Sequence, residues 1–201
     1  MVRILFYICL LIFNFSSLTA QDFWYEGVIT LKNNLSLTGD ISFNKELSNI
    51  TYKSSLYEKS FNINELSAFS FNDYDLGIER YFITSTTENE TELLEVLVEG
   101  RLPVYRKAKD HVTAIFSNSL TEEDYEFYIR KENELVHIKD FENAILPKIT
   151  WEFPFEIRDF VYTYNLKLKI TGHIVLIMQH YNALTSPEID HSRVQKLLST
   201  R

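Results

Sequence analysis

The chain has 201 residues, of which 45% are hydrophobic and 24% charged, with only 5 Gly and 4 Pro. These are globular proportions, and they exclude a disordered, collagen-like or Gly/Pro-rich low-complexity chain. The formal net charge of −8 excludes a general binder of nucleic acid or of anionic membrane surfaces, because both need an excess of Lys and Arg. The length suits one sizeable core and is short for two full domains.

The first twenty residues have the layout of a secretory signal peptide. Arg3 supplies a positive charge, residues 4–13 form an unbroken apolar run, and polar and small residues follow up to Ala20. We expect cleavage after Ala20, with a retained anchor as the alternative; the run is shorter than the ~20 residues of a membrane-spanning helix. The single cysteine, Cys9, lies in this segment, so the mature chain would be cysteine-free, without disulfides or thiolate metal sites.

After Trp24 the chain alternates between turn signals and short segments rich in Val, Ile, Thr, Tyr and Phe. Such spacing is typical of an antiparallel meander, sandwich or open barrel. Gly39 is a candidate bulge or bend, and residues 110–124 are expected to form an exposed loop. The predicted strands are 27–31, 35–43, 49–53, 60–63, 68–71, 81–84, 93–98, 102–106, 125–130 and 135–138.

The pattern becomes helical from about Asp140, which is the expected N-cap of a first short helix. A second helix over 154–166 places Phe155, Phe160, Val161 and Tyr164 near one face, and further helices are expected over 169–183 and 190–198. The fold class is therefore α+β, with the helices packed on an antiparallel sheet. We expect a signal peptide (1–20) and one domain (21–201), β-rich over 23–139 and helical over 140–198; no transmembrane helix is expected in the mature chain.

The histidines do not form a recognisable metal site. His173 and His180 lie two helical turns apart, about 10 Å along the axis, which is too far for one ion. A third histidine, His137, lies near Asp140 at a strand end, while His111 and His191 have polar surroundings. The chain lacks the G-x-S-x-G elbow, the H-E-x-x-H motif and a Gly-rich phosphate loop. We assign no catalytic residue, cofactor or metal ligand.

Residues 72–77 (NDYDLG) form the best local cluster of cation ligands. Asp73 and Asp75 alternate as in a calcium loop, but Gly77 is at the wrong offset, and Thr84 stands where a bidentate Glu belongs. A turn between strands explains the same residues and is the favoured interpretation, with calcium binding left open.

Two blocks of opposite charge follow one another, and both are expected to lie on a salt-bridged, solvated surface. Paired carboxylates could instead serve glycoside hydrolysis if they faced each other across a cleft. The acidic block is Glu88, Glu90, Glu92, Glu95 and Glu99; the basic block is Arg101, Arg106, Lys107 and Lys109.

Aromatic residues could stack on a sugar or peptide, but most are expected in the core. The segment 151–155 (WEFPF) is expected to be a packing plug at the junction of sheet and helices. The aromatic candidates are Trp24, Tyr25, Tyr52, Tyr57, Tyr74, Tyr105 and Trp151.

The chain resembles small exported proteins of unknown function from Bacteroidetes. The resemblance is carried by residues 27–31 (GVITL), 37–41 (LTGDI), 95–100 (EVLVEG), Val104-Tyr105 and the C-terminal His180-Tyr181-Asn182. It covers most of the mature chain and implies location and domain type, with no activity or site residue to carry over.

Two functional hypotheses follow, beside a third in which the protein is purely structural and has no specific partner. The first is a non-enzymatic module, located in the periplasm, at the outer membrane or outside the cell, that binds an envelope protein or surface component through a sheet edge or loop. The alternative is a small-ligand-binding protein or hydrolase with a cleft between sheet and helices, using His137, Asp140 or Glu95. Strand order, oligomeric state and partner identity remain open.

Overall fold

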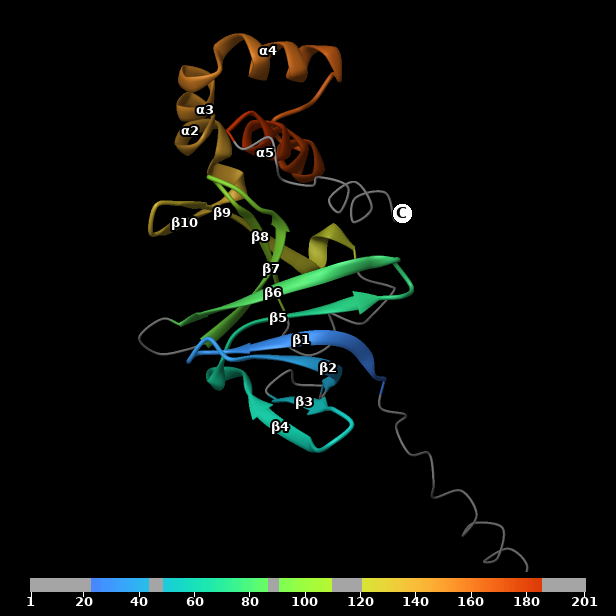
Figure 1. Ribbon diagram of the computed structural model, residues 1–201. Helices are drawn as coiled ribbons and strands as arrows, with labels where there is room; N and C mark the ends of the chain where they lie inside the picture. Colours follow the sequence, from blue (N-terminus) through green and yellow to red (C-terminus); the bar gives the residue numbers. More distant parts are fainter. Residues whose placement is uncertain (1–22, 44–48, 87–90, 110–120, 186–201) are drawn as a thin grey trace, which may run out of the picture.

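The computed structural model describes residues 23–43, 49–86, 91–109 and 121–185. In these residues ten strands form one antiparallel sheet with the order β10-β9-β8-β7-β6-β5-β1-β2-β3-β4 (Figure 1). The predicted α+β class is confirmed. The strands are β1 (Tyr25–Leu31), β2 (Ser36–Phe43), β3 (Asn49–Lys53), β4 (Glu58–Asn62), β5 (Leu66–Asp73), β6 (Ile78–Thr86), β7 (Thr91–Val98), β8 (Val104–Ala108), β9 (Tyr125–Lys131) and β10 (Glu134–His137).

The sheet consists of two meanders joined in the middle. The chain runs through β1 to β4, turns in the short 3-10 helix η2 (Ile63–Glu65), and returns as β5 to pair with the free side of β1. The turn is fixed by a capping box: Asn62 accepts a hydrogen bond from the Asn64 amide, and Glu65 accepts one from the Asn62 amide. From β5 each strand pairs with the next as far as β10.

Two glycines face each other on β1 and β2. Gly27 and Gly39 lie in an uninterrupted β1–β2 register, so of the two features expected at Gly39, a bulge or a bend, the bulge is absent. A Cβ on Gly39 would lie 2.8 Å from the Tyr52 ring and 2.5 Å from the Lys53 carbonyl oxygen. Glycine is needed here because the Tyr52 ring lies against the strand, where its hydroxyl donates to the Thr38 carbonyl at 3.0 Å.

The helices cover the other end of the sheet (Figure 1). They are α2 (Phe141–Ala144), α3 (Leu146–Glu152), α4 (Pro154–Thr163) and α5 (Thr171–Thr185), with the 3-10 helices η3 (Glu122–Asp124) and η4 (Ile138–Asp140) before them. Asp140 takes the expected N-cap position of α2, although its side chain makes no capping hydrogen bond there. Helix α3 was not predicted, and the expected helix 190–198 lies outside the described residues.

Two large clusters of buried apolar residues share the sheet. The first joins the helices to β7–β10, with Val104 and Ile129 on the strands and Ile149, Ile157 and Tyr181 on the helices, all at most 1% exposed. The second covers β1–β6 and is rich in stacked rings; Phe69 and Phe82 lie 4.8 Å apart between centroids. The polar network described below lies mainly on β6, β7 and β8, between these two clusters, with Asp73 at the end of β5.

Helix α5 is joined to the segment between β7 and β8 by the Asn182 side chain, whose amide exchanges two hydrogen bonds with the Leu102 backbone as a neighbouring strand would. The amide of Leu102 donates to Asn182 Oδ1 at 3.0 Å, and Asn182 Nδ2 donates to the Leu102 carbonyl at 2.9 Å. Gly100, with φ +132°, leaves room for this contact; a Cβ there would lie 2.6 Å from Asn182 Cγ. Leu102 and Asn182 are 1% and 0% exposed, so both polar groups of the Leu102 backbone depend on this amide.

Candidate functional site

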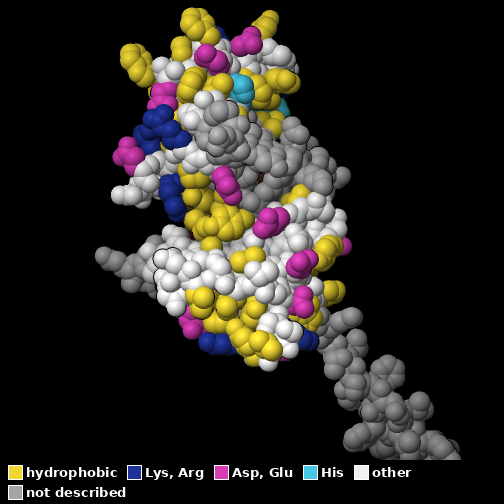
Figure 2. Space-filling view, in the orientation of Figure 1, with side chains coloured by type: hydrophobic (Ala, Val, Ile, Leu, Met, Phe, Trp, Pro, Cys, Tyr) yellow, Lys and Arg dark blue, Asp and Glu magenta, His cyan; other side chains and the backbone are white. Residues whose placement is uncertain are grey.

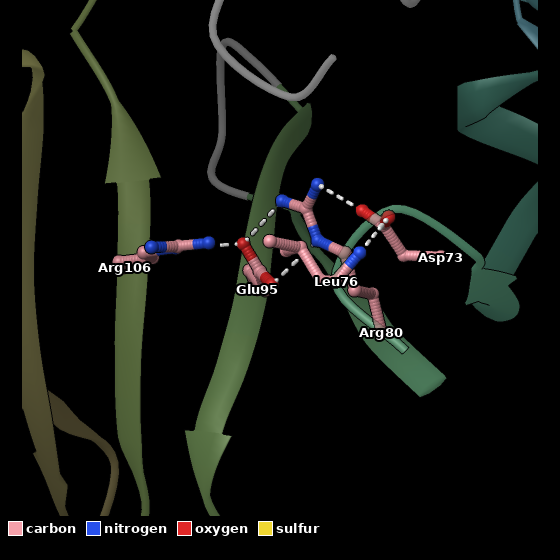
Figure 3. A network of polar contacts seen from close by, with 5 residues as sticks. All are labelled: Asp73, Leu76, Arg80, Glu95 and Arg106. Carbon is pink, nitrogen blue, oxygen red and sulfur yellow. Dashed lines mark hydrogen bonds and ion pairs between the residues drawn. The ribbon is translucent and has the colours of Figure 1, made fainter. Parts of the chain in front are cut away.

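The acidic residue named as a possible catalyst, Glu95, lies in a buried ion network (Figure 3). Arg80 binds it with two donors, Nε to Oε1 at 2.9 Å and Nη2 to Oε2 at 2.7 Å. Arg106 donates from Nε to Oε2 at 2.7 Å. Arg80 also forms an ion pair with Asp73 at 3.5 Å. The strand register explains this grouping, because Glu95 of β7 lies directly opposite Arg106 of β8.

Aromatic rings complete the surroundings of both guanidinium groups. The Arg80 guanidinium lies 5.7 Å from the Phe71 ring centroid and 5.2 Å from that of Phe82, and the Arg106 guanidinium lies 4.3 Å from that of Tyr125. Such cation–π contacts offset part of the cost of removing the charges from water. The side chains of Arg80 and Glu95 are 2% and 3% exposed.

The electrostatics favour the charged forms of Glu95 and Arg80. Burial alone would raise the pKa of Glu95, but the charges of Arg106 and Arg80 and their hydrogen bonds lower it to about 2. Burial would lower the pKa of Arg80, but the Glu95 carboxylate raises it. A carboxylate with so low a pKa is a poor proton acceptor at neutral pH, so Glu95 is unsuited to general acid or base catalysis.

The acidic and basic blocks are therefore only partly a solvated surface. The expectation is wrong for Glu95, which is buried. It holds for Lys107 and Glu92, which form a half-buried ion pair, and for Arg101, which pairs with Glu152 at 2.9 Å and is 54% exposed. Glu88 and Glu90 lie outside the described residues.

The described histidines make structural contacts. His173 Nδ1 accepts from the Lys167 amide at 2.8 Å, in the turn before α5. His180 stacks on Phe160 at 4.0 Å, and burial lowers its pKa. His137 Nδ1 accepts from the Lys139 amide at 3.1 Å, and its ring meets Tyr128. His111 and His191 lie outside the described residues.

Residues 74–77 form the predicted turn between β5 and β6, and Asn72 and Asp73 end β5. Asp73 organises it: its Oδ1 accepts from the Leu76 amide at 3.1 Å, its carbonyl accepts from the Gly77 amide at 2.7 Å, and its Oδ2 faces Arg80. Gly77 has φ +63°, the left-handed conformation that glycine suits. Asp73 is thus engaged within the protein, and this geometry gives no second reason to place calcium between Asp73 and Asp75.

The most exposed aromatic residues of the described chain include a group on α3 and α4. Trp151 is 87% exposed, Phe155 76% and Tyr162 86%. We call these three residues the aromatic face; Figure 2 shows hydrophobic side chains standing out from this helical end, with acidic side chains among them. Exposed large apolar groups gathered in this way mark a contact surface more often than a random scatter does.

The aromatic face corrects two predictions. Trp151 and Phe155 are not a packing plug, and Phe155 does not share a buried face with Phe160. Each follows or precedes a buried isoleucine by two residues: Trp151 follows Ile149, and Phe155 precedes Ile157. Two residues correspond to about 200° around a helix, so each ring points away from the core. Of the segment 151–155, Phe153 packs inward, against Tyr181 at 5.9 Å.

A shallow hollow of about 570 Å³ runs along α4 between the rings of Phe155 and Tyr162. It is lined by Phe155, Glu156, Arg158, Asp159 and Tyr162, all from one helix. A small-molecule site buries most of its ligand, and an open hollow on one helix cannot do so. This surface therefore suits a macromolecular partner. Sequence reasoning missed Trp151 because its offset from Ile149 needs the helix α3 to be recognised first; for Phe155 the signal was its two-residue offset from Ile157 within the predicted helix 154–166.

Within the described ranges, no cluster of three or more His, Cys, Asp or Glu side chains could hold a metal ion. The same part of the chain contains no helix with the length and apolarity needed to cross a membrane. No protein-family model matches this chain, no curated protein is significantly similar to it in sequence, and no solved structure is significantly similar to it in fold.

Proposed function

We propose that this chain is an exported, non-enzymatic binding module of a bacterial envelope, and that it binds a protein partner through the aromatic face. The observation that carries the proposal is the exposure of Trp151, Phe155 and Tyr162 on two adjoining helices. Trp and Tyr are the residues most enriched at the energetic centres of protein interfaces. Export rests on the signal-peptide pattern of residues 1–20, and the bacterial envelope on the resemblance to exported Bacteroidetes proteins.

The polar side chains argue in the same direction. Of the residues named for the hydrolase alternative, Glu95 is engaged by two arginines and His137 accepts a hydrogen bond from the Lys139 amide. The sequence also offers a sheet edge or a loop as the contact site. Of the two edge strands, β4 carries exposed Glu58 and Lys59 and β10 carries exposed Glu134, and such charges discourage the addition of another strand. The aromatic face is therefore the stronger candidate for the contact site.

The test is site-specific photo-cross-linking in the cells that make the full chain. A photoreactive amino acid replaces Phe155 or Tyr162, and in a control it replaces Glu79, an exposed residue of β6. We expect discrete cross-linked species from positions 155 and 162 and none from position 79. The proposal fails if positions 155 and 162 give the same background as the control.

Export is tested on the same material. The N-terminal residue of protein recovered from the envelope fraction should be Gln21, which follows the predicted cleavage site. An N-terminus at Met1, or recovery from the cytosol alone, would contradict the export part of the proposal and leave the binding part standing.

A further inference from the structure

We infer that the partner on α4 is a second copy of this chain, with the two α4 helices side by side and parallel. This inference rests on the proposed function, in that it takes the aromatic face as a contact surface and names its occupant. The contact is formed by four residues of α4, which we call the α4 stripe: Phe155, Arg158, Asp159 and Tyr162.

The α4 stripe has the geometry of a helix-packing surface. Phe155 and Tyr162 are seven residues apart, so they lie on the same side of the helix, about 10 Å apart along its axis. Ile157 is on the opposite side, 1% exposed and buried in the core. Large residues at this spacing are the ones that interlock when two helices pack against each other.

The charges of the stripe complement those of a copy of itself. Arg158 and Asp159 are both exposed and lie between the two rings, about 50° to either side of the line that joins them. When two identical helices pack in parallel about a two-fold axis, the Arg158 side of each meets the Asp159 side of the other. Two Arg158–Asp159 pairs then form between the copies, at a position along the helix axis between Phe155 and Tyr162. In an antiparallel pair the same sides would meet, arginine against arginine and aspartate against aspartate.

The same charges disfavour a lipid surface. Phe155 and Tyr162 could enter the headgroup region only together with Arg158, Asp159 and Glu156, which line the hollow between them. Two of these three are acidic, as is the whole chain with its net charge of −8, so anionic lipids would be repelled. In a dimer, in contrast, Arg158 of each copy is neutralised by Asp159 of the other.

The area sets the strength of the contact. An aromatic side chain presents roughly 150–250 Å². Covering the stripe on both copies therefore buries on the order of 600–1,000 Å², which is the size of a weak or transient interface. We expect a dimer that forms and dissociates with concentration, in the micromolar range.

Sedimentation of the purified mature chain (from Gln21) over a dilution series tests the inference. The wild-type chain should pass from monomer to dimer, and F155A should weaken dimerisation at least about tenfold. The matched control is L56A, which removes an apolar side chain that is 88% exposed, from the β3–β4 turn at the other end of the molecule (Figure 1). It should leave the dimer unchanged.

Charge exchange tests the parallel arrangement. R158D alone places two acidic residues opposite each other at both contacts, and D159R alone places two basic ones; each should weaken the dimer about tenfold. Mixing the R158D chain with the D159R chain should restore dimerisation as a heterodimer, as should the double variant R158D/D159R with itself. E142K, an exposed change on α2, is the control for altered net charge.

Three outcomes would overturn the inference. The first is a chain that stays monomeric throughout the dilution series. The second is a dimer that is insensitive to F155A, R158D and D159R. The third is binding of the purified chain to zwitterionic vesicles that F155A abolishes. If the cells nevertheless give a cross-link from position 155 to a different protein, the proposed function stands and only the identity of the partner is wrong.

Discussion

The carboxylate of Glu95 lies between two guanidinium groups and serves both as a counter-charge, while Arg80 also pairs with Asp73 at 3.5 Å. Arg80 donates twice to Glu95 and Arg106 once, in a region where the side chains of Arg80 and Glu95 are almost fully buried. A buried ion pair contributes little net stability compared with an apolar replacement of the same shape. Removal of one partner, however, leaves uncompensated charge in a medium that solvates it poorly.

Glu95→Gln should therefore lower the free energy of unfolding by about 3–5 kcal/mol, because the buried Arg80 and the partly buried Arg106 stay charged when the carboxylate they share is removed. Urea unfolding followed by circular dichroism measures this loss. The matched control is Glu92→Gln, which breaks the more exposed pair with Lys107 and should cost at most about 1 kcal/mol. Equal losses for the two variants would contradict the burial argument.

The wild type and Glu95→Gln should also differ in how their unfolding free energy depends on pH. The pKa of Glu95 is about 2 in the folded protein, below its ordinary value of 4.5. The stability that its charge contributes is complete above the unfolded pKa and is lost as the pH falls from about 4.5 towards about 2. The difference in unfolding free energy between wild type and Glu95→Gln should shrink across this range. A difference that stays constant from pH 6 to about pH 2.5 would disagree with a lowered pKa.

Tryptophan fluorescence can report directly on the environment of Trp151. The chain has two tryptophans, so Trp24→Phe leaves Trp151 as the only one. Because Trp151 is 87% exposed, its fluorescence should be red-shifted and readily quenched by acrylamide in the folded state at low protein concentration. Trp151→Ala should in turn change the free energy of unfolding by no more than about 0.5 kcal/mol. Blue-shifted, protected emission would show that this residue is buried after all.

At the scale of elements, helix α5 packs into the core with its apolar side chains, and one amide group, that of Asn182, joins it to the backbone of Leu102. Asn182 satisfies both the N–H and the C=O of Leu102, so a helix completes the hydrogen bonding of a loop that lies between β7 and β8. A second link lies close by: the Tyr181 hydroxyl donates to Glu152 of α3 at 2.6 Å, and the same carboxylate binds Arg101. Burial and the bond to Glu152 raise the pKa of Tyr181 to about 12, so this donor keeps its proton at neutral pH.

Asn182→Ala should destabilise the protein by about 2–4 kcal/mol, because two buried backbone groups lose their partners. Thermal and urea unfolding measure the loss. The control is Asn143→Ala, which removes an exposed amide from α2 and should stay within about 0.5 kcal/mol of the wild type. If both variants unfold at the same urea concentration, the Leu102 backbone has found other partners.

At the scale of the whole molecule, the helices complete the core of the sheet. Val104, Phe127 and Ile129 of β8 and β9 are at most 7% exposed, and they pack in one cluster with Ile149, Ile174 and Met178 of the helices. The second cluster, over β1–β6, contains no helical residue among those described. The ion network on β6, β7 and β8 lies between the two.

A fragment of residues 21–140 should therefore fail to fold cooperatively, because removal of the helices exposes the apolar face of β8 and β9. Compared with the chain 21–201, we expect strong binding of the dye ANS and a broad thermal transition by circular dichroism. A sharp transition with little dye binding would instead show that the strands form a domain of their own.

The local patterns of the sequence were sufficient to predict all ten strands. Alternation of apolar and polar residues, as in 125–130, and turn residues such as those of 72–77 are properties of neighbours along the chain. The return of β5 to β1 could not be derived, because strand order depends on contacts between distant segments. Helix α3 was missed because it is short, follows α2 directly, and begins beside Pro147.

The candidate site was less accessible to prediction. Glu95 stands in an acidic block whose pattern is that of a solvated strand face; only the pairing of β7 with β6 and β8 brings Arg80 and Arg106 to it. Trp151 and Phe155 are large aromatic residues of the kind that usually packs in a core. Their exposure depends on which side of α3 and α4 meets the sheet, and that choice is made by Ile149 and Ile157.

The sequence by itself determined the α+β class, the positions of the strands and the two longer helices, and the acidic net charge, because these depend on composition and local periodicity. The tertiary structure alone decided the strand order, the burial of Glu95 and the exposure of the aromatic face. These features depend on which residues, far apart in the chain, exclude water from one another. Burial is therefore a property of the folded molecule, and the same glutamate or tryptophan can lie in the core or on the surface according to what packs against it.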